Sequence, residues 1–394
     1  MKKILIVNKS FAVGGIQTAL SNMLTYLSDK YDVDLLVFYD KGPIRERIPK
    51  NVRIIRPSLL VQSLGFSFSD IRNCRNLIVV IFRMFAAIWT RIFNNKLPVN
   101  IALATQKRLK GYDVAISYHH EPGKKVVVSG FTRFVDRCVE AKKKIGWIHY
   151  DRKHDKLDDS YIITVYDKMD ALVFVTEATK RSFIDKYVQF KDKCVHINNF
   201  IDYERIRRMS LEADNVYDRK PNELIMFTAC RLNKEKGILR GIKAIAPLMR
   251  KYKDIKWYIG GDGNEREKIE ELIKAEKLEG RVILLGLLQN PYPYMREADI
   301  FLLLSEHEAG PMVINEAKAL GLPVFSTRTT AAEEMIEDGF EGFICENSEE
   351  GIRSGLEKIL TERNKIEFCR TYLKSKKFDN SESMGRITEL FDGE

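Results

Sequence analysis

Apolar residues in the C-terminal half of the chain fall in short runs, separated by charged stretches whose pattern is helical. Charged stretches of this kind cover residues 237–252 and 264–276. Alternation of short apolar runs with helices predicts βαβ units and therefore a parallel sheet. The apolar runs occupy residues 224–229, 255–259, 282–285, 300–304, 323–326 and 342–345. Ligands of such sheets bind at the carboxyl ends of the strands, so the residues that follow these runs are candidates for chemistry.

The N-terminal half has the same rhythm in a less regular form. Its apolar runs occupy residues 4–7, 33–38, 52–55, 114–117, 145–148, 172–175 and 194–197. A polar stretch at 202–222, rich in Arg, Asp and Asn, is a predicted linker. We therefore predict an α/β protein of two Rossmann-like domains, whose parallel sheets face a central cleft. The predicted domains are residues 1–202 and 203–375, followed by a C-terminal helix in 376–394 that crosses back to the N-terminal domain.

The segment 71–95 has a different pattern. Its apolar run is interrupted by Arg83 and Arg91, whereas spanning a membrane takes about 20 mostly apolar residues. At about 100° per residue, six polar side chains fall within about 100° of one another. They are Arg72, Arg75, Asn76, Arg83, Thr90 and Asn94. We predict one basic amphipathic helix lying in the interface of an anionic membrane. The alternative is a helix that packs its apolar side on the sheet and shows its arginines to water.

Charge is distributed unevenly along the chain. The formal net charge is +10, and residues 1–202 carry 34 Lys and Arg against 20 Asp and Glu. The basic half predicts an anionic partner, such as phosphates or an acidic membrane leaflet; the alternative is a solvated lysine surface. The six cysteines are far apart and include no Cys-x-x-Cys pair, which argues against disulfides and zinc. The first apolar run is too short for a signal peptide, so a cytoplasmic protein is expected.

The most informative stretch is SEHEAGPMVINEAKALGLPVFST at residues 305–327. A buried strand is followed by a loop with Glu308 and Gly310, and then by a helix that begins near Met312. Loop amides and the helix N-terminus at a strand end can bind a diphosphate. Glu308 can accept hydrogen bonds from sugar hydroxyls, and Glu316, within the helix, can accept both hydroxyls of a ribose.

A second loop carries cations at a helix start. Arg231 and Lys236 follow the run 224–229, and both side chains suit phosphate. The alternative is an ordinary basic loop, but cations at a helix N-terminus oppose its dipole, so a binding function explains them better. The glycines at 260–263 lack the full Gly-x-Gly-x-x-Gly form, which argues against a dinucleotide.

Three turns in the N-terminal half complete the candidate site. Gly14 and Gly15 follow the first run, where a ligand can approach the backbone closely; an ordinary tight turn is the alternative. His149 ends an apolar strand within the segment 145–151, on the side where ligands bind. His120 follows the strand at 114–117. A lone histidine is more often structural, and for His120 both interpretations stay open.

Glu308 and Glu316, with Ala317 and the Gly-x-Pro-Val turn at 321–324, resemble the signature of glycosyltransferase family four, whose members are retaining enzymes of the GT-B fold. The resemblance implies that Arg231 and Lys236 neutralise the leaving diphosphate, that His149 approaches the donor sugar and that His120 lies near the acceptor. The predicted catalytic residues are Arg231, Lys236, Glu308 and His149. The predicted donor-binding residues are Gly14, Gly15, Arg231, Lys236, Leu288, Glu308, Ala309, Gly310, Pro311, Met312, Val313 and Glu316. The sequence departs from the family at residues 309–311, where many members have Gly-Phe-Gly and Pro311 removes a backbone donor.

The resemblance implies transfer of a hexose or N-acetylhexosamine from a nucleotide diphosphate sugar, with a UDP-sugar favoured and neither metal nor cofactor required. The expected acceptor is a glycan, carried on polyprenyl diphosphate if the segment 71–95 meets the membrane, as in capsule, exopolysaccharide or lipopolysaccharide synthesis. The protein would then lie peripherally on the inner face of the cell membrane, and no nucleic acid is expected. The alternatives are a nucleotide-sugar epimerase or hydrolase of the same fold, and a non-catalytic sugar- or lipid-binding relative. An epimerase would lack the helix with the two glutamates, and a binding relative would be expected to lose Arg231, Lys236 or Glu308.

Overall fold

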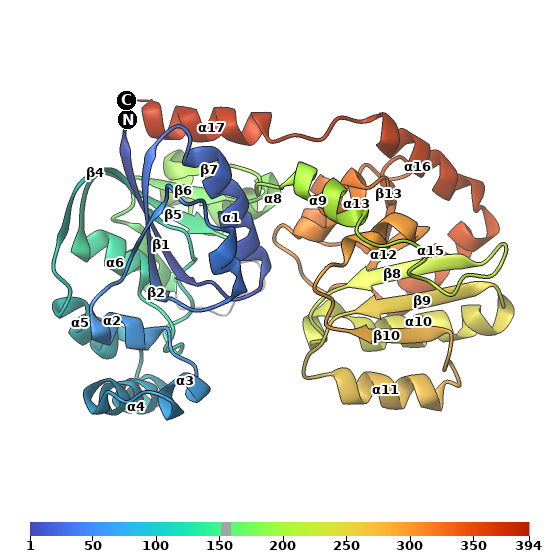
Figure 1. The fold of residues 1–394 in the computed structure, drawn as a ribbon, viewed down its shortest axis with the longest axis horizontal. Helices are drawn as coiled ribbons and strands as arrows, with labels where there is room; N and C mark the ends of the chain where they lie inside the picture. Colours follow the sequence, from blue (N-terminus) through green and yellow to red (C-terminus); the bar gives the residue numbers. More distant parts are fainter. Residues whose placement is uncertain (151–158, 394) are drawn as a thin grey trace. The chain divides into compact units, whose positions relative to one another are not determined.

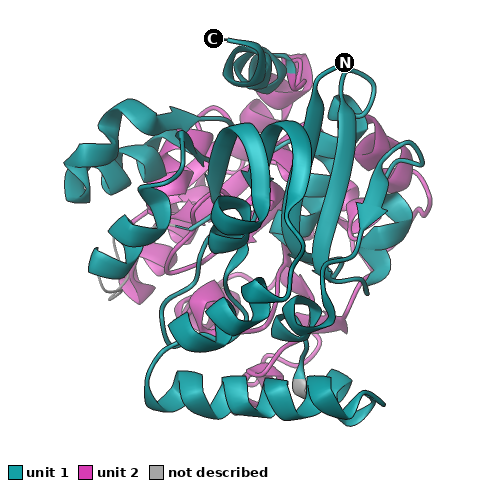
Figure 2. Ribbon diagram, turned by 90° about the vertical axis from the view of Figure 1, so that its left-hand side faces the viewer, with its two compact units in different colours: residues 1–200, 381–394 teal, residues 201–380 magenta. Residues whose placement is uncertain are grey.

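The computed structural model describes residues 1–150 and 159–393, which form two compact units. The first unit comprises Met1–Phe200 together with Ser381–Glu394, and the second comprises Ile201–Asn380 (Figure 2). Residues 203–210, expected as part of a polar linker, instead form helix α9, which packs against α12 (Tyr292–Glu297) and α13 (Met312–Ala319) of the second unit.

Among the described residues, the first unit has a seven-stranded parallel sheet in the order β3-β2-β1-β4-β5-β6-β7. The chain leaves β1 toward β3 on one side and returns to β4 on the other, so the order reverses between β1 and β4. The strands are β1 (Lys3–Ser10), β2 (Asp32–Tyr39), β3 (Arg53–Ile55), β4 (Leu109–Ser117), β5 (Val139–Ile148), β6 (Ala171–Phe174) and β7 (Cys194–His196).

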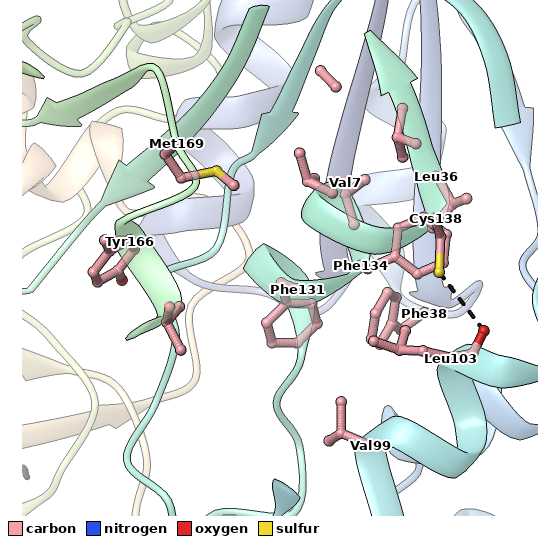
Figure 3. Close-up of a cluster of buried hydrophobic side chains, with 14 of the residues drawn as sticks. Val7, Leu36, Phe38, Val99, Leu103, Phe131, Phe134, Cys138, Tyr166 and Met169 are labelled. Atoms are coloured by element: carbon pink, nitrogen blue, oxygen red, sulfur yellow. Dashed lines mark hydrogen bonds between the residues drawn. The ribbon is translucent and has the colours of Figure 1, made fainter. Parts of the chain in front are cut away.

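Both faces of this sheet are covered, because its strands are almost continuously apolar. One face packs on α1 and α17 through residues such as Leu24 and Phe391. The other packs on a cluster that includes Phe38, Phe131 and Phe134 (Figure 3). The helices of this unit are α1 (Gly15–Leu27), η1 (Pro43–Arg47), α2 (Leu59–Leu64), α3 (Phe68–Arg72), α4 (Leu77–Ile92), α5 (Lys96–Ala104), α6 (Phe131–Cys138), α7 (Asp159–Tyr166), α8 (Glu177–Lys186), η3 (Val188–Lys193) and α17 (Ser381–Asp392).

The predicted helix over residues 71–95 is wrong in extent and in orientation. The chain forms α3 and then α4, with a break at 73–76 where the Asn76 side chain caps α4 by accepting from the Val79 N–H at 3.2 Å. Arg83 and Thr90, expected in a solvent-facing stripe, are buried. The Arg83 Nη2 donates to the Phe66 carbonyl at 2.9 Å. Neither sequence interpretation placed these two side chains inward. Within the described parts of the chain, no helix is both long and apolar enough to cross a bilayer.

The second unit, over its described residues, has a six-stranded parallel sheet in the order β10-β9-β8-β11-β12-β13. The order reverses between β8 and β11, which pair directly (Ile300 beside Met226). The strands are β8 (Leu224–Ala229), β9 (Ile255–Gly260), β10 (Val282–Gly286), β11 (Ile300–Leu303), β12 (Val324–Thr327) and β13 (Gly342–Cys345). Each lies within one residue of a predicted apolar run, so the prediction of two parallel sheets is confirmed.

Helices cover both faces of this second sheet (Figure 1). Its largest buried side chain, Trp257, lies under α10 and donates through Nε1 to the Thr228 hydroxyl at 3.0 Å. The helices are α9 (Tyr203–Ser210), η4 (Lys234–Lys236), α10 (Ile238–Lys251), α11 (Arg266–Ala275), α12 (Tyr292–Glu297), α13 (Met312–Ala319), α14 (Thr330–Met335), α15 (Glu349–Thr361) and α16 (Asn364–Ser375).

Candidate functional site

The loops after β8 and β11 meet at the point where the strand order of the second sheet reverses. This is the place where open parallel sheets bind ligands. Lys236, in the loop after β8, lies 2.7 Å through its Nζ from the Glu308 Oε1 in the loop after β11. The Ser305 hydroxyl donates to the same Oε1 at 2.7 Å. The structure therefore brings Lys236 and Glu308 together, and it adds Ser305, which the sequence did not single out.

The ion pair between Lys236 and Glu308 is mostly buried, with side-chain exposures of 23% and 11%. Burial alone would lower the pKa of the Lys236 ammonium, but the charge and hydrogen bond of Glu308 outweigh it, so that pKa lies above its ordinary value. Lys236 is therefore a fixed cation at neutral pH. Both contacts of Glu308 fall on Oε1, and its Oε2 has no hydrogen-bond partner among the described residues. That oxygen can accept from a ligand hydroxyl.

The turn that carries Lys236 is packed directly on the end of β11. Gly237 has a φ of +67°, and a Cβ there would lie 2.1 Å from the Leu304 carbonyl oxygen, so only glycine fits. The Glu306 N–H donates to the Glu235 carbonyl at 2.8 Å. From the other side, the Asn347 Nδ2 donates to the Glu306 carbonyl at 3.0 Å. These contacts fix the distance between the two loops.

Arg231 lies in the same loop after β8, and its exposed guanidinium makes no hydrogen bond or ion pair with another described residue. The backbone beneath it is held by Gly261, whose φ is +143° and whose Cβ would lie 1.8 Å from the Cys230 carbonyl oxygen. Gly261 and Gly263 are therefore explained by packing against the Arg231 loop, since a Cβ on Gly263 would lie 2.2 Å from the Leu232 carbonyl oxygen. Leu288, in the loop after β10, packs over Gly260, where a Cβ would meet its Cδ1 at 2.6 Å.

Helix α13 begins at the same edge of the sheet. Ala309 and Gly310 lie in the loop before it, Pro311 is its N-cap, and Met312 and Val313 open it. Pro311 makes no side-chain cap, and the first turn of α13 holds no acidic residue that would offset the positive end of the helix dipole. Glu316 is buried on the second turn and accepts from the Tyr292 hydroxyl at 3.4 Å.

The first unit places its candidates at the corresponding point, where its strand order reverses between β1 and β4. Gly14 and Gly15 follow β1, and a Cβ on Gly15 would have no described atom within 4 Å. His149 follows β5, and its ring lies 4.8 Å from that of Tyr118. Burial lowers the pKa of His149 to about 3, and its Nε2 has no hydrogen-bond partner in the described chain. Asp151, the last residue of the segment 145–151, lies outside the described residues.

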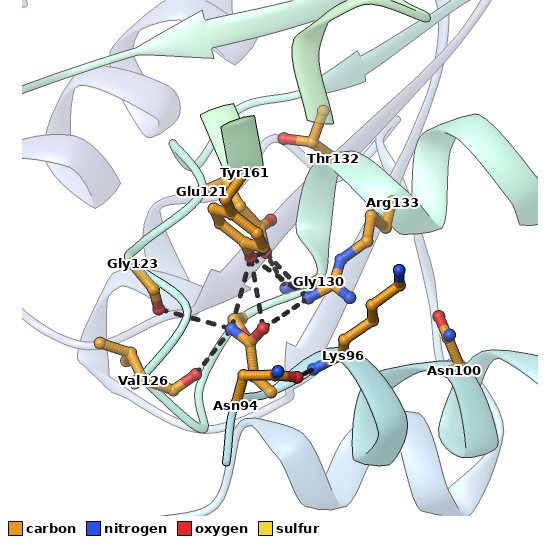
Figure 4. Close-up of polar contacts among 12 residues, drawn as sticks. Asn94, Lys96, Asn100, Glu121, Gly123, Val126, Gly130, Thr132, Arg133 and Tyr161 are labelled. Atoms are coloured by element: carbon orange, nitrogen blue, oxygen red, sulfur yellow. Dashed lines mark hydrogen bonds and ion pairs between the residues drawn. The ribbon is translucent and has the colours of Figure 1, made fainter. Parts of the chain in front are cut away.

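A buried polar network, which the sequence did not reveal, fixes the loop after β4 that carries His120 (Figure 4). The Glu121 Oε1 accepts from the Gly130 N–H at 2.9 Å and from the Tyr161 hydroxyl at 2.9 Å. Arg133 pairs with the same carboxylate at 3.4 Å and donates to the Asn95 Oδ1 at 3.1 Å. The His120 ring itself lies 4.9 Å from the His119 ring, whose pKa burial lowers to about 4.

Residues 210–376 match the family described as glycosyl transferases group 1, a range that holds every candidate of the second unit. This matched range, which makes up most of the second unit, belongs to the group 1 glycosyltransferases. The sequence is 25% identical over 377 residues, covering 91% of this chain and 90% of the relative, to the N-acetylgalactosamine-N,N'-diacetylbacillosaminyl-diphospho-undecaprenol 4-alpha-N-acetylgalactosaminyltransferase of Campylobacter jejuni. The alignments cover only 60% of an uncharacterized glycosyltransferase of Methanocaldococcus jannaschii and 39% of an N-acetyl-alpha-D-glucosaminyl L-malate synthase of Bacillus anthracis.

Similarity to solved structures establishes the fold over the full length of the chain. HepE of Anabaena, in complex with UDP and glucose, matches with a TM-score of 0.68 and 17% identity over the full length of both chains. The apo form of the lipopolysaccharide outer core galactosyltransferase WaaB matches with a TM-score of 0.62 and 16% identity. The prediction of a GT-B fold is confirmed. Within the described residues, no group of three or more His, Cys, Asp or Glu is arranged to hold a metal ion.

Proposed function

We propose that this chain transfers a hexose or N-acetylhexosamine from a nucleotide diphosphate sugar to a glycan acceptor, with retention of anomeric configuration. The observation that carries the proposal is the Lys236–Glu308 pair at the reversal point of the second sheet. It sets a fixed cation and a free carboxylate oxygen beside a helix N-terminus. A diphosphate and the sugar attached to it require that combination of charges at neighbouring positions.

The donor would be held by residues of the second unit. Arg231, Lys236 and the first amides of α13 would face the diphosphate, Glu308 would accept from sugar hydroxyls, and Glu316 would accept from the ribose. The Lys236 ammonium has three N–H donors, so it can contact a phosphate while it keeps Glu308. Backbone groups beside Leu288 would meet the base.

In the transfer step, the bond between the anomeric carbon and the diphosphate oxygen breaks. The acceptor oxygen bonds to that carbon from the same face, and its proton passes to the departing phosphate oxygen. Charge accumulates on the diphosphate as it leaves, and cations already in position stabilise it without reorganisation. Two such side chains and a helix N-terminus supply this charge, so we propose that no divalent ion is needed.

Two relatives support the choice of substrates. The Campylobacter relative, aligned over 91% of this chain, is named for transfer to a diphospho-undecaprenol-linked saccharide. We therefore propose a polyprenyl-diphosphate-linked glycan as the acceptor, met by His120, in the synthesis of a capsule, exopolysaccharide or lipopolysaccharide. A UDP-sugar is the favoured donor, because HepE was solved in complex with UDP-glucose.

A nucleotide-sugar panel tests the proposal. UDP-, GDP- and ADP-sugars are screened by thermal shift with and without EDTA, and the ligand that raises the melting temperature is then supplied with lipid-linked acceptors. We expect one nucleotide class to stabilise the protein in EDTA and the sugar to appear on the acceptor. Binding without any transfer would indicate a non-catalytic relative, and stabilisation only with a divalent ion would refute metal independence.

A further inference from the structure

Helix α4 turns an apolar face away from the unit that carries it. Six aliphatic side chains on this helix are each between 54% and 71% exposed. They are Leu77, Ile78, Ile81, Met84, Ile88 and Ile92, and we call them the apolar face of α4. Apart from the neighbours Leu77 and Ile78, these residues recur every three or four positions, which places them along one side of the helix. Single exposed aliphatic residues are ordinary, but six in register on one helix mark an interaction surface.

The opposite side of α4 is the one that packs on the unit. Val79, Phe82 and Ala86 are buried there, together with Arg83 and Thr90, and the helix contacts α2 and α5. Figure 1 shows α4 along the lower edge of the first unit, beyond these two helices, and a long helix of the first unit lies along the lower edge of Figure 2 as well. The helix is therefore apolar on both sides, which is typical of a helix buried in an assembly or a membrane.

The stretch of sequence that contains this helix carries charge of one sign. Residues 71–112 contain eight Lys and Arg and no Asp or Glu. Arg75 and Arg91 are exposed near the two ends of α4. At its C-terminal end, the Lys125 Nζ donates to the Arg91 carbonyl at 3.3 Å and to the Ile92 carbonyl at 3.0 Å, which holds another cation beside the apolar face. The partner of this surface must accept aliphatic side chains and supply negative charge.

We propose that the apolar face of α4 docks into the interface of an anionic lipid bilayer. With 16 residues, α4 is about 24 Å long at about 1.5 Å per residue, so it lies in a bilayer surface and does not cross a hydrocarbon core of about 30 Å. Aliphatic side chains flanked by cations are the pattern of an interfacial helix. A second copy of the chain fits less well, since a twofold contact would bring two basic rims together without carboxylates in 71–112 to pair them. Anionic lipid headgroups supply that charge.

The docking helix is fastened to the loop proposed to meet the acceptor. Asn95 follows α4, and its N–H donates to the Lys124 carbonyl at 2.8 Å while its Nδ2 donates to the Ser129 hydroxyl at 2.8 Å. Through Arg133, Asn95 also joins Glu121, the neighbour of His120. A bilayer under α4 would hold a lipid-linked acceptor near that loop. This consequence rests on the proposed function, whereas the docking itself does not.

Flotation of the full chain with vesicles tests the docking. The vesicles are phosphatidylcholine alone, or phosphatidylcholine with one third phosphatidylglycerol, at low salt and without nucleotide sugar. We expect the wild type to float with the anionic vesicles only. Ile81→Glu/Ile88→Glu, at sites each 59% exposed, should reduce the bound fraction at least tenfold. The matched control is Val188→Glu/Leu211→Glu, which adds the same charge at sites 70% and 68% exposed and should float like the wild type.

Three outcomes would overturn the docking. The first is wild-type protein that stays at the bottom of the gradient with anionic vesicles. The second is an Ile81/Ile88 variant that floats as well as the wild type. The third is a Val188/Leu211 control that loses as much flotation as the Ile81/Ile88 variant. A wild type that sediments as a dimer, fails to float and becomes monomeric in the Ile81/Ile88 variant would assign the face to a second copy. Circular dichroism confirms that each variant is folded. Wild-type protein that floats with anionic vesicles but transfers no sugar would refute the proposed function and leave the docking intact.

Discussion

Replacing Lys236 with methionine removes the ammonium from the candidate site and keeps most of the side-chain stem. In the structure, Lys236 contributes one contact of 2.7 Å to Glu308, which still keeps its hydrogen bond from Ser305. If the ammonium also faces the leaving diphosphate, its loss removes one preorganised donor from the transition state. Removing one such donor costs about 3–4 kcal/mol, a fall of about 10²–10³ in kcat/KM.

The effect on folding should be smaller. The pair is partly exposed at Lys236, and charged hydrogen bonds contribute about 1.5–3 kcal/mol before solvent screening. We therefore expect a loss of stability of about 1 kcal/mol, measured by urea unfolding, beside a much larger loss of activity. Lys236→Arg, which keeps the charge, should recover part of the activity.

Lys234 provides the matched control, because it lies two residues away in the same turn and is exposed. Lys234→Met changes the net charge equally and should keep kcat/KM within about twofold of the wild type. Initial rates are measured at subsaturating donor with a lipid-linked acceptor. The leaving-group role of Lys236 is refuted if the folded Lys236→Met variant turns over as fast as Lys234→Met.

Three further measurements bear on other parts of the chain. Glu316→Ala should weaken nucleotide-sugar binding more than tenfold by calorimetry, because two hydrogen bonds to a carboxylate are lost; unchanged affinity would exclude contact with the ribose. Gly237→Ala should lower the melting temperature sharply, since its Cβ would collide with the Leu304 carbonyl, whereas Gly280→Ala, also at positive φ but in open space, should lower it less. Burial lowers the pKa of His149 to about 3, below its value in the unfolded chain, so unfolding takes up a proton and stability falls as the pH drops from 7 to 5. His149→Gln should reduce that fall by at most about 2 kcal/mol in urea titrations, and an identical pH profile would contradict this.

The sheets could be predicted because parallel strands buried on both faces leave a direct record in the sequence. The run 224–229 coincides with β8, and 282–285 falls within β10. The candidate loops could be located for the same reason, since each begins where an apolar run ends. The hydrogen-bond partners of the residues in these loops could not be predicted. Ser305 donates to Glu308 because of the conformation of one loop, and Arg133 joins Glu121 to Asn95 through tertiary packing. Nothing in the sequence near these residues marks such pairing.

The orientation of α4 could not be predicted, because periodicity separates two sides of a helix without saying which one faces the protein. Arg83 lies inward since its Nη2 reaches the Phe66 carbonyl, an acceptor 17 positions earlier that no local pattern reveals. Burial lowers the pKa of its guanidinium, which shows that this placement opposes ionisation. Because burying Arg83 is unfavourable, the charge pattern of α4 does not explain which side faces inward. We infer that the packing of α4 on α2 and α5 determines it.

The glycines of the two units differ in what requires them. At Gly237 and Gly261, a Cβ would collide with backbone carbonyl oxygens of the same unit, so the fold itself demands glycine there. At Gly15, a Cβ would meet no described atom within 4 Å, and Gly14 has the extended φ of 173° that any residue adopts. A Cβ on Gly14 would approach the Gln17 Oε1 at 2.8 Å, the far end of a flexible side chain, so the first unit gives no internal reason for a glycine at position 15. A reason from outside the unit would be a ligand whose phosphates approach this backbone at the reversal point of the sheet. Gly15→Val should then block donor binding and leave the melting temperature of the free protein unchanged, because the added side chain meets no described atom of the unit.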